Sequence, residues 1–167
     1  MKKKSFCPYC RAPLKNKFCE GRLRRYCDTC REPIYENPVP ATGVVVADGP
    51  DRILLVKRNI EPKLGQWCLP GGFMELDETP EQCALRELKE ETGLSGRINV
   101  LIGVTAHPNR LYGTVLMLGY LVTQCSGRLT PGDDVSEAAY FQQDLLPEVA
   151  FESHRRFIRI YSAAYKA

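Results

Sequence analysis

The sequence predicts an α/β fold in which a mixed sheet lies between helices, preceded by a small, separate N-terminal segment. Two observations predict the larger part: apolar, β-branched runs stand before and after one central helix, and a second helix closes the chain. A third observation predicts the separate segment. Residues 1–31 hold ten Lys and Arg against two acidic residues, a charge of +8, whereas the remaining chain has 13 basic and 18 acidic residues, or −5.

Length and composition limit the class of protein. A chain of 167 residues has room for one ordinary domain plus a small appendage, and 44% hydrophobic with 26% charged residues excludes disorder and collagen-like repeats. No apolar run approaches the roughly 20 residues that span a bilayer, and the N-terminal lysines lead into cysteines rather than into a secretory signal. We therefore expect a cytoplasmic protein without membrane contact, in which paired cysteines indicate metal rather than disulfides.

Prolines mark the boundary between the two parts. The segment 31–40 contains three prolines, which disfavour regular structure, so we expect a linker there. This boundary divides the chain into a cysteine-containing domain at residues 1–35 and a larger domain at residues 36–167. Beyond the linker, two β-branched runs flank the sequence DGPD at 48–51, which is typical of a hairpin turn.

A turn-rich segment leads to the central helix, and both ends of this helix are signalled. Thr79 is a candidate N-cap, Pro80 suits the first turn, and Gln82 completes a capping box. Gly93 supplies a left-handed C-cap, so the helix should run to about Thr92. Further strands are expected near 98–105, 114–122 and 138–141, and a final helix near 151–165.

The central helix places three carboxylates on one face, because Glu87, Glu90 and Glu91 stand at i, i+3 and i+4. Leu85 and Leu88 project to the side of that face, where they can enter the core. One interpretation of the carboxylates is a solvated helix face whose like charges repel one another weakly. The other is a cation site, because hard Mg²⁺ or Mn²⁺ prefers clustered carboxylate oxygens.

This helix and the loop before it resemble the Nudix box, G-x5-E-x7-R-E-U-x-E-E-x-G-U. Every fixed position of the box is matched, by Gly72, Glu78, Arg86, Glu87, Leu88, Glu90, Glu91, Gly93 and Leu94. The resemblance covers roughly Val39 to the C-terminus, including a Leu-Pro-Gly-Gly lead-in at 69–72. It implies a Nudix α/β/α sandwich with a mixed sheet. It also implies metal-dependent hydrolysis of a nucleoside diphosphate linked to another moiety.

The resemblance further implies roles for individual residues. The implied ligands of Mg²⁺ or Mn²⁺ are Glu87, Glu90, Glu91 and a backbone carbonyl at Gly71 or Gly72, of which we take Gly72. Glu78 and Arg86 would orient the loop and the helix as part of the catalytic machinery, to which Glu87 and Glu90 also belong.

The general base is open between a box glutamate and a carboxylate further along the chain. Asp133, Asp134 and Glu137 lie on a downstream loop of the kind that carries the base in some Nudix proteins. We take Glu137 as the candidate from this loop. The alternative interpretation is an ordinary acidic surface turn.

Two Cys-x-x-Cys pairs, Cys7 with Cys10 and Cys27 with Cys30, are separated by sixteen residues. This spacing resembles a zinc ribbon, in which four thiolates bind a structural Zn²⁺ tetrahedrally. About thirty residues bury little core, so the metal would provide the fold. Among the remaining cysteines, Cys19 is an alternative zinc ligand. The other three stand in apolar contexts and are expected in the core: Cys68, Cys83 and Cys125.

The charge of the ribbon leaves its role open. With four thiolates and one Zn²⁺ counted, the +8 of residues 1–31 becomes about +6, which would still attract nucleic acid or an anionic substrate. Ribbons also serve as packing or dimerisation modules. We favour a structural or dimer-forming role over nucleic-acid binding. In the dimer-forming case, a second copy of the chain is the partner and the assembly is a homodimer.

A zinc ribbon followed by a Nudix domain resembles the architecture of NADH pyrophosphatases. Their downstream SQPWPFPxS array is absent here, where the chain reads GVTAHPNRLYGTVLML. Within this segment, a wall that contacts a base or phosphate could be formed by His107, Arg110 and Tyr112, with an ordinary loop as the alternative. We take Arg110 and Tyr112 as the candidate substrate ligands.

We predict a nucleotide pyrophosphatase that cleaves a small-molecule nucleotide of the ADP-ribose, NADH or FAD type. One alternative is a Nudix-fold protein that senses a nucleotide or binds nucleic acid. Another is a hydrolase that processes RNA ends. The complete set of box carboxylates favours an enzyme, because a binding protein does not need all of them.

Overall fold

The computed structural model describes residues 4–165. The chain divides into two compact units, Met1–Pro38 with Pro108–Thr114 and Val39–His107 with Val115–Ala167. Each unit contains its own buried apolar cluster. Among the described residues, no helix is long and apolar enough to cross a membrane.

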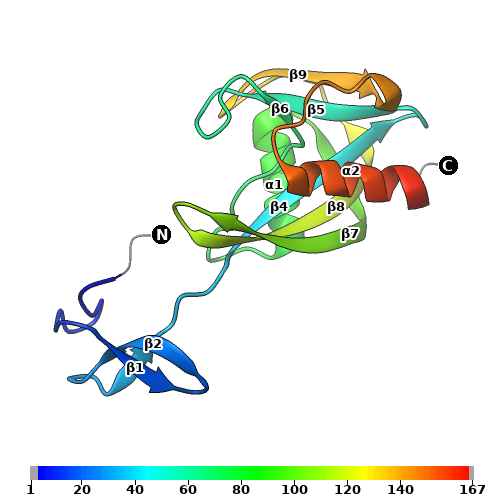
Figure 1. Cartoon of the computed structure of the whole chain (residues 1–167). Helices are drawn as coiled ribbons and strands as arrows, with labels where there is room; N and C mark the ends of the chain where they lie inside the picture. The colour runs from blue at the N-terminus through cyan, green and yellow to red at the C-terminus, as the bar shows by residue number, and fades with distance from the viewer. Residues whose placement is uncertain (1–3, 166–167) are drawn as a thin grey trace. The chain divides into compact units, whose positions relative to one another are not determined.

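The smaller unit is built on a three-stranded antiparallel sheet in the order β1-β2-β3. Its strands are β1 (Lys15–Cys19) and β2 (Arg22–Cys27), both labelled in Figure 1, and β3 (Glu32–Ile34). Glu20 and Gly21 join β1 to β2 with φ of 51° and 73°, the left-handed pair that suits a tight hairpin turn. A core of the size found in this unit does not stabilise a fold alone. Its buried residues are Cys7, Leu14, Cys27 and Ile34.

The expectation of a linker over 31–40 is wrong for most of that segment. Residues 32–34 form β3 and Val39 begins the next strand, so within 32–40 only residues 35–38 lie outside strands. Proline lacks an N–H, and it is accommodated at edge strands and near strand starts. Pro33 lies in the edge strand β3, and Pro40 is the second residue of its strand, so neither breaks the pairing.

The larger unit contains a six-stranded sheet in the order β6-β5-β4-β8-β7, with β9 paired to β5 off this path. β4 and β8 run parallel, whereas β5 is antiparallel to β4, β6 and β9. The mixed sheet predicted from the sequence is therefore confirmed. The strands are β4 (Val39–Asp48), β5 (Arg52–Arg58), β6 (Trp67–Cys68), β7 (Ser95–Asn109), β8 (Gly113–Ser126) and β9 (Val135–Gln142).

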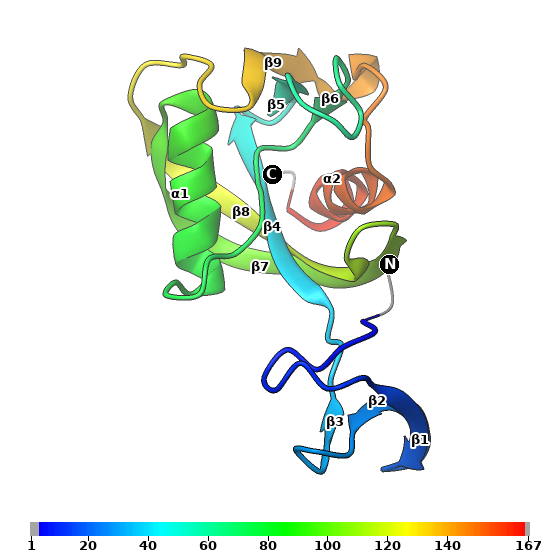
Figure 2. The same ribbon diagram turned by 90° about the vertical axis from the view of Figure 1, so that its left-hand side faces the viewer.

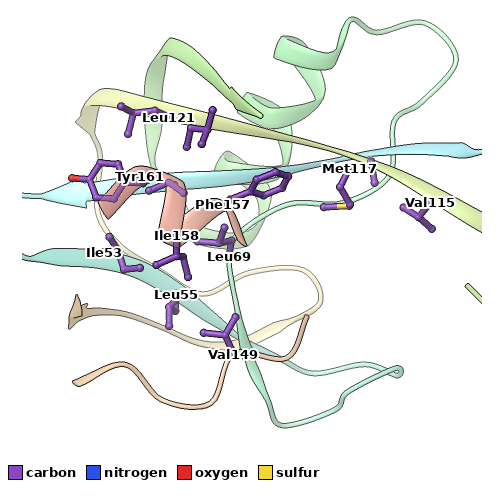
Figure 3. Close-up of a cluster of buried hydrophobic side chains, with 13 residues drawn as sticks. Ile53, Leu55, Leu69, Val115, Met117, Leu121, Val149, Phe157, Ile158 and Tyr161 are labelled. Carbon is purple, nitrogen blue, oxygen red and sulfur yellow. The ribbon is translucent and has the colours of Figure 1, made fainter. Parts of the chain in front are cut away.

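Two helices cover opposite faces of this sheet, α1 (Pro80–Thr92) and α2 (Glu152–Ala164), with β4 between them (Figure 2). Alternation along β4 divides the core, because Val44 packs with Leu88 of α1 while Val45 packs with Phe157 of α2. A short 3-10 helix, η1 (Gln143–Leu145), precedes α2. Figure 3 shows the α2 side of the core, where its labelled side chains include Ile53, Leu55, Leu69, Met117, Phe157, Ile158 and Tyr161.

The elements predicted from the sequence are present, and two strands are longer than expected. The central helix has its predicted bounds and caps, and the final helix begins and ends within one residue of expectation. The runs at 98–105 and 114–122 belong to β7 and β8, which form one long hairpin. β7 alternates between exposed and half-buried positions almost throughout, so its strand continues through polar residues that an apolar run does not include.

Candidate active site

Both ends of α1 are fixed by local hydrogen bonds. The Thr79 hydroxyl accepts from the Gln82 N–H at 3.3 Å, and the Gln82 side chain accepts from the Thr79 N–H at 2.7 Å, which completes the predicted capping box. At the other end Gly93 adopts a φ of 72°, and its N–H donates to the Lys89 carbonyl. The helix therefore presents its carboxylates from a well-fixed backbone.

Arg86 joins three of the predicted site carboxylates. Its Nε and Nη2 donate to the two oxygens of Glu78 at 2.9 and 2.7 Å, which makes a bidentate pair. Its Nη1 donates to Glu87 at 2.8 Å and to Glu90 at 3.0 Å, and Nη2 also reaches the Phe73 carbonyl at 3.1 Å. The structure thus brings these four charged side chains together as one hydrogen-bonded group.

Glu78 ties the loop before α1 to the helix. Besides its bonds from Arg86, its carboxylate accepts from the Glu75 N–H at 2.8 Å. These bonds, chiefly those from Arg86, lower the pKa of Glu78 to about 2. Glu78 is consequently ionised at neutral pH and is suited to anchoring the loop rather than to carrying a proton.

Glu87 and Glu91 are withdrawn from water, since only 9% of Glu87 and 6% of Glu91 is exposed. Burial raises the pKa of both carboxyls, to about 8 for Glu91. The Gly71 N–H donates to Glu91 at 2.8 Å and partly opposes that rise. Two neighbouring buried carboxylates are costly as anions unless a cation compensates them.

The donor set fits a hard divalent cation. A Cβ on Gly72 would stand 2.4 Å from Glu87 Oε1, so the missing side chain keeps the space beside that carboxylate clear. Carboxylate oxygens around such a space are the ligands that Mg²⁺ and Mn²⁺ prefer. The Gly72 carbonyl, the predicted backbone ligand, accepts from the Thr42 N–H at 2.8 Å, so a cation would share that oxygen.

Among the downstream acidic residues, Asp133 lies close enough for its charge to act on the box glutamates. It contributes to the raised pKa of both Glu87 and Glu91, after burial. Glu137, the predicted base, lies on β9 and is paired with Lys57 at 2.7 Å. Asp133 therefore acts on the box glutamates through its charge, whereas Glu137 is occupied by Lys57, and the assignment of the base stays a prediction.

The two candidate substrate ligands lie in the turn between β7 and β8. Arg110 and Tyr112 belong to the segment Pro108–Thr114, which is grouped with the smaller unit. Asn109 shapes this turn, because its side-chain oxygen accepts from the N–H groups of Leu111 and Tyr112 at 2.8 and 3.1 Å. Their role toward a substrate stays a prediction.

The sequence argument missed two residues, one whose charge acts on Glu91 and one that holds the chain just before the Pro-Gly-Gly turn. Arg58 ends β5, and its charge favours the ionised form of Glu91 while it disfavours protonation of His154. His154 is buried, and its Nδ1 accepts from the Leu69 N–H at 3.0 Å, directly before the Pro-Gly-Gly turn. Burial lowers the pKa of His154 to about 3, so the ring stays neutral and can accept.

The sequence contains a signal for the burial of His154. This residue falls on the buried face of α2, at the helical spacing of the apolar residues Phe157, Ile158 and Tyr161. Arg58 carries no comparable signal, because a basic residue at the end of a strand is common on a protein surface.

The cysteine pairs form a second candidate metal site. The Sγ atoms of Cys7, Cys10, Cys27 and Cys30 all lie within 4.8 Å of one another. A hydrogen bond from the Cys10 backbone is the main cause that lowers the pKa of Cys7 to about 7, and the Cys30 N–H donates to Cys27 Sγ at 3.4 Å. Four sulfurs in one group, some already accepting backbone N–H donors, fit a structural Zn²⁺.

The other cysteines lie outside this group. Cys19 donates to the Lys17 carbonyl at 3.8 Å and does not replace a member of the four. Cys68 and Cys83 are buried and Cys125 is half-buried, in keeping with the expectation of core residues.

Comparisons with known sequences concern both units. The family model of the NUDIX domain matches residues 37–161. An ADP-ribose pyrophosphatase from Methanocaldococcus jannaschii is 39% identical over 130 residues, which cover 77% of this chain and 75% of that protein. An NAD-capped RNA hydrolase NudC from Stutzerimonas stutzeri is 29% identical over 161 residues, 95% of this chain and 56% of that protein. This chain thus spans about half the length of the NudC relatives it matches.

Solved structures share the fold. A Nudix hydrolase from Nitrosomonas europaea superposes with a TM-score of 0.80 at 27% identity, covering 97% of this chain and 92% of that chain. A MutT Nudix hydrolase from Burkholderia pseudomallei gives a TM-score of 0.68 at 28% identity, covering 74% and 98%. The α/β/α sandwich implied by the sequence resemblance is confirmed.

Proposed function

The chain belongs to the Nudix hydrolase family, and from this premise we propose that it is a divalent-metal-dependent pyrophosphatase that hydrolyses ADP-ribose. The observation that carries the proposal is the pair of buried carboxylates, Glu87 and Glu91, beside the space left by Gly72. Buried anions of this kind are typical of functional sites, because their cost is recovered only when a cation binds. The name of the M. jannaschii relative supports ADP-ribose as the substrate.

Bound Mg²⁺ or Mn²⁺ would neutralise the pyrophosphate and lower the pKa of a water for attack on phosphorus. The protein's own contribution is positional. Arg86 fixes the carboxylates of Glu87 and Glu90, and the Gly71 N–H fixes that of Glu91. The residues that would hold the cation are Glu87, Glu90, Glu91 and the carbonyl of Gly72.

We assign removal of the water proton to a carboxylate oxygen of Asp133 or of a box glutamate. Asp133 is preferred to Glu137, because Glu137 is already paired with Lys57. A carboxylate without a cationic partner accepts a proton more readily than one in an ion pair.

The cysteine unit would be a zinc ribbon at residues 1–35, and the Nudix domain would occupy residues 36–167. A Zn²⁺ at the four clustered thiolates would supply the folding free energy that the small apolar core lacks. Thiols held as a cluster rather than as disulfides suit a reducing, cytoplasmic setting. We favour a packing or dimer-forming role for this unit.

A second candidate function is hydrolysis of NAD-capped RNA. The alignment with the S. stutzeri NudC covers 95% of this chain, so the similarity includes residues of the cysteine unit. The +8 charge of residues 1–31 suits a polyanionic substrate. We rank this activity second, because the NADH pyrophosphatase array is absent and the identity is lower.

A substrate panel tests the proposal. The full chain is incubated with Mg²⁺ or Mn²⁺ and with ADP-ribose, NADH, FAD or NAD-capped RNA, and the products are separated by chromatography. ADP-ribose and water should give AMP and ribose 5-phosphate with the highest kcat/KM, and Glu90→Gln should lose this activity. A higher kcat/KM for NAD-capped RNA would favour the second candidate. The absence of any turnover would contradict the proposal in favour of a nucleotide-binding protein.

A further inference from the structure

The Pro-Gly-Gly turn at residues 70–72 carries two of the backbone groups that the candidate metal site uses. The Gly71 N–H donates to the Glu91 carboxylate at 2.8 Å, and the Gly72 carbonyl is the candidate backbone ligand of the cation. The position of the turn therefore sets the position of both groups. A displacement of about 1 Å at such a group can lower activity about 100-fold.

Strand β4 holds this turn from one side. The Val44 N–H donates to the Pro70 carbonyl at 2.8 Å, and the Thr42 N–H donates at the same distance to the carbonyl two residues further along the turn. The approach is close, because a Cβ on Gly71 would stand 2.2 Å from the Thr42 backbone oxygen. These bonds fix carbonyl oxygens of the turn, whereas the chain that enters the turn is held from another element.

The segment before α2 pairs with the chain that enters the turn. Trp67 of β6 forms an isolated parallel bridge with Val149, and the Ala150 N–H donates to the Trp67 carbonyl at 2.8 Å. Alternate residues of a strand bond to the same neighbour, so the next donor on this side is the Leu69 N–H. The pairing does not continue to Leu69, because the neighbouring segment turns into α2 at Glu152.

His154 supplies the acceptor for this donor. Its Nδ1 accepts from the Leu69 N–H at 3.0 Å, and both residues are buried. The ring lies against β4, where a Cβ on Gly43 would stand 3.8 Å from Nε2, and its centroid is 5.1 Å from that of the Phe151 ring. Burial lowers the pKa of His154 to about 3, so the ring is neutral at physiological pH and Nδ1 can accept.

We propose that His154 is a positioning residue for the metal site. Its hydrogen bond fixes the chain at Leu69, two residues before the Gly71 N–H and three before the Gly72 carbonyl, and so keeps these groups beside the box glutamates. Helix α2 thereby contributes to the site, although the predicted ligands lie on α1 and in the turn. The inference rests on the proposed function, because the turn needs exact placement only if it serves a metal site.

Packing alone is the alternative role for His154, and two substitutions separate it from the hydrogen bond. Leucine would fill much of the same space but would leave the buried Leu69 N–H without an acceptor, which is costly. Asparagine carries a carbonyl oxygen near the position of Nδ1 and can keep the bond. His154→Asn should therefore behave as wild type in the three measurements below, and His154→Leu should not.

NMR of the metal-free full chain tests the bond directly. In wild type, the His154 Nδ1 signal should be that of an unprotonated ring nitrogen, with a coupling across the hydrogen bond to the Leu69 amide. This amide should exchange with solvent about tenfold faster in His154→Leu than in wild type or His154→Asn, because a buried hydrogen bond is lost. Absence of the coupling in wild type, or equal exchange in all three proteins, would overturn the proposal.

Mn²⁺ titration of the same proteins, followed by electron paramagnetic resonance, tests the consequence for the site. His154→Leu should bind Mn²⁺ at least about tenfold more weakly, the usual loss when a group that orients a metal ligand is removed. Ile158→Val is the control, because it removes one carbon from the next turn of α2 in the buried cluster that contains Leu69 (Figure 3). Both variants should lower the urea midpoint, but Ile158→Val should keep its Mn²⁺ affinity. Wild-type affinity in His154→Leu, or an equal loss in Ile158→Val, would overturn the proposal.

Kinetics with ADP-ribose at saturating Mn²⁺ separate failure of this inference from failure of the proposed function. His154→Leu should lower kcat about 10- to 100-fold with KM little changed, because the turn orients the metal site rather than the nucleotide. If wild type hydrolyses ADP-ribose and His154→Leu keeps its kcat, the inference fails and the proposed function stands. If no nucleotide is hydrolysed while Mn²⁺ affinity still depends on the acceptor at residue 154, the proposed function fails and the positioning role stands.

Discussion

Replacing Gly72 with alanine should disable the metal site without unfolding the protein. Gly72 is not among the glycines with a left-handed φ, so alanine can adopt its backbone conformation. The added Cβ would stand 2.4 Å from Oε1, 2.6 Å from Cδ and 2.7 Å from Oε2 of Glu87. Ordinary contacts begin near 3.4 Å, so the Glu87 carboxylate has to move by about 1 Å.

The displacement sets the size of the effect. A shift of about 1 Å at a catalytic group can lower activity about 100-fold, so we expect kcat/KM to fall by that factor and Mn²⁺ affinity to fall with it. Stability should change little, because the atom displaced is the end of a flexible side chain. The main loss is the contact between Glu87 and Arg86, a partly solvated ion pair worth at most about 1 kcal/mol.

Gly71→Ala is the matched control. Gly71 has a φ of 146°, and a Cβ there would stand 2.2 Å from the backbone oxygen of Thr42, which cannot move away. This variant should lower the free energy of unfolding in urea by several kcal/mol, whereas Gly72→Ala should lower only kcat/KM and Mn²⁺ binding. Wild-type activity in Gly72→Ala would refute the placement of Glu87 in the metal site. Equal destabilisation in both variants would show that Gly72 serves the fold.

Cys27→Ser should reduce bound zinc from about one ion per chain to none and expose the smaller unit to protease; metal analysis that finds no zinc in a protease-resistant wild type would contradict the ribbon. Lowering the pH from 7 to 4.5 should reduce the unfolding free energy of wild type by about 2.5 kcal/mol relative to that of His154→Asn, measured in urea. The unfolded ring, with a pKa of 6.5, takes up a proton that the native ring, with a pKa of about 3, does not. Asp133→Asn should lower kcat with Mn²⁺ affinity retained, while Glu137→Gln should keep kcat; the reverse would restore Glu137 as the base. Glu91→Gln should lose turnover yet raise the urea midpoint of the metal-free protein, because folding must either bury the Glu91 charge or add a proton to this carboxyl, whose pKa burial raises to about 8; retained turnover would remove Glu91 from the ligand set.

The parts of the fold that were predictable are those decided by neighbours in sequence. The Thr79 cap, its Gln82 partner and the Gly93 stop each act within four residues, so the bounds of α1 followed from the sequence. The prediction of a linker in the proline-rich segment was wrong for the opposite reason. Whether Pro33 ends a strand depends on which strand lies beside it, and only the sheet order places it at an edge.

The candidate site divides in the same way. Helical spacing was enough to bring Glu87, Glu90 and Glu91 together. Spacing along the downstream loop did not show which carboxylate turns toward them. The pairing of β5 with β9 sets Glu137 opposite Lys57 and so supplies its partner, a relation between residues 80 positions apart that no local pattern contains.

The last turns of α1 and the first turn of α2 differ in the charge that each favours. The carboxylates of α1 lie in its last two turns, where the helix dipole disfavours negative charge. A bound cation would therefore offset both their mutual repulsion and the effect of the dipole. The start of α2 is uncapped and favours an anion. Neutral His154, in the first turn of α2, accepts from the Leu69 N–H, which keeps the Pro-Gly-Gly turn in place without adding a charge beside Arg58.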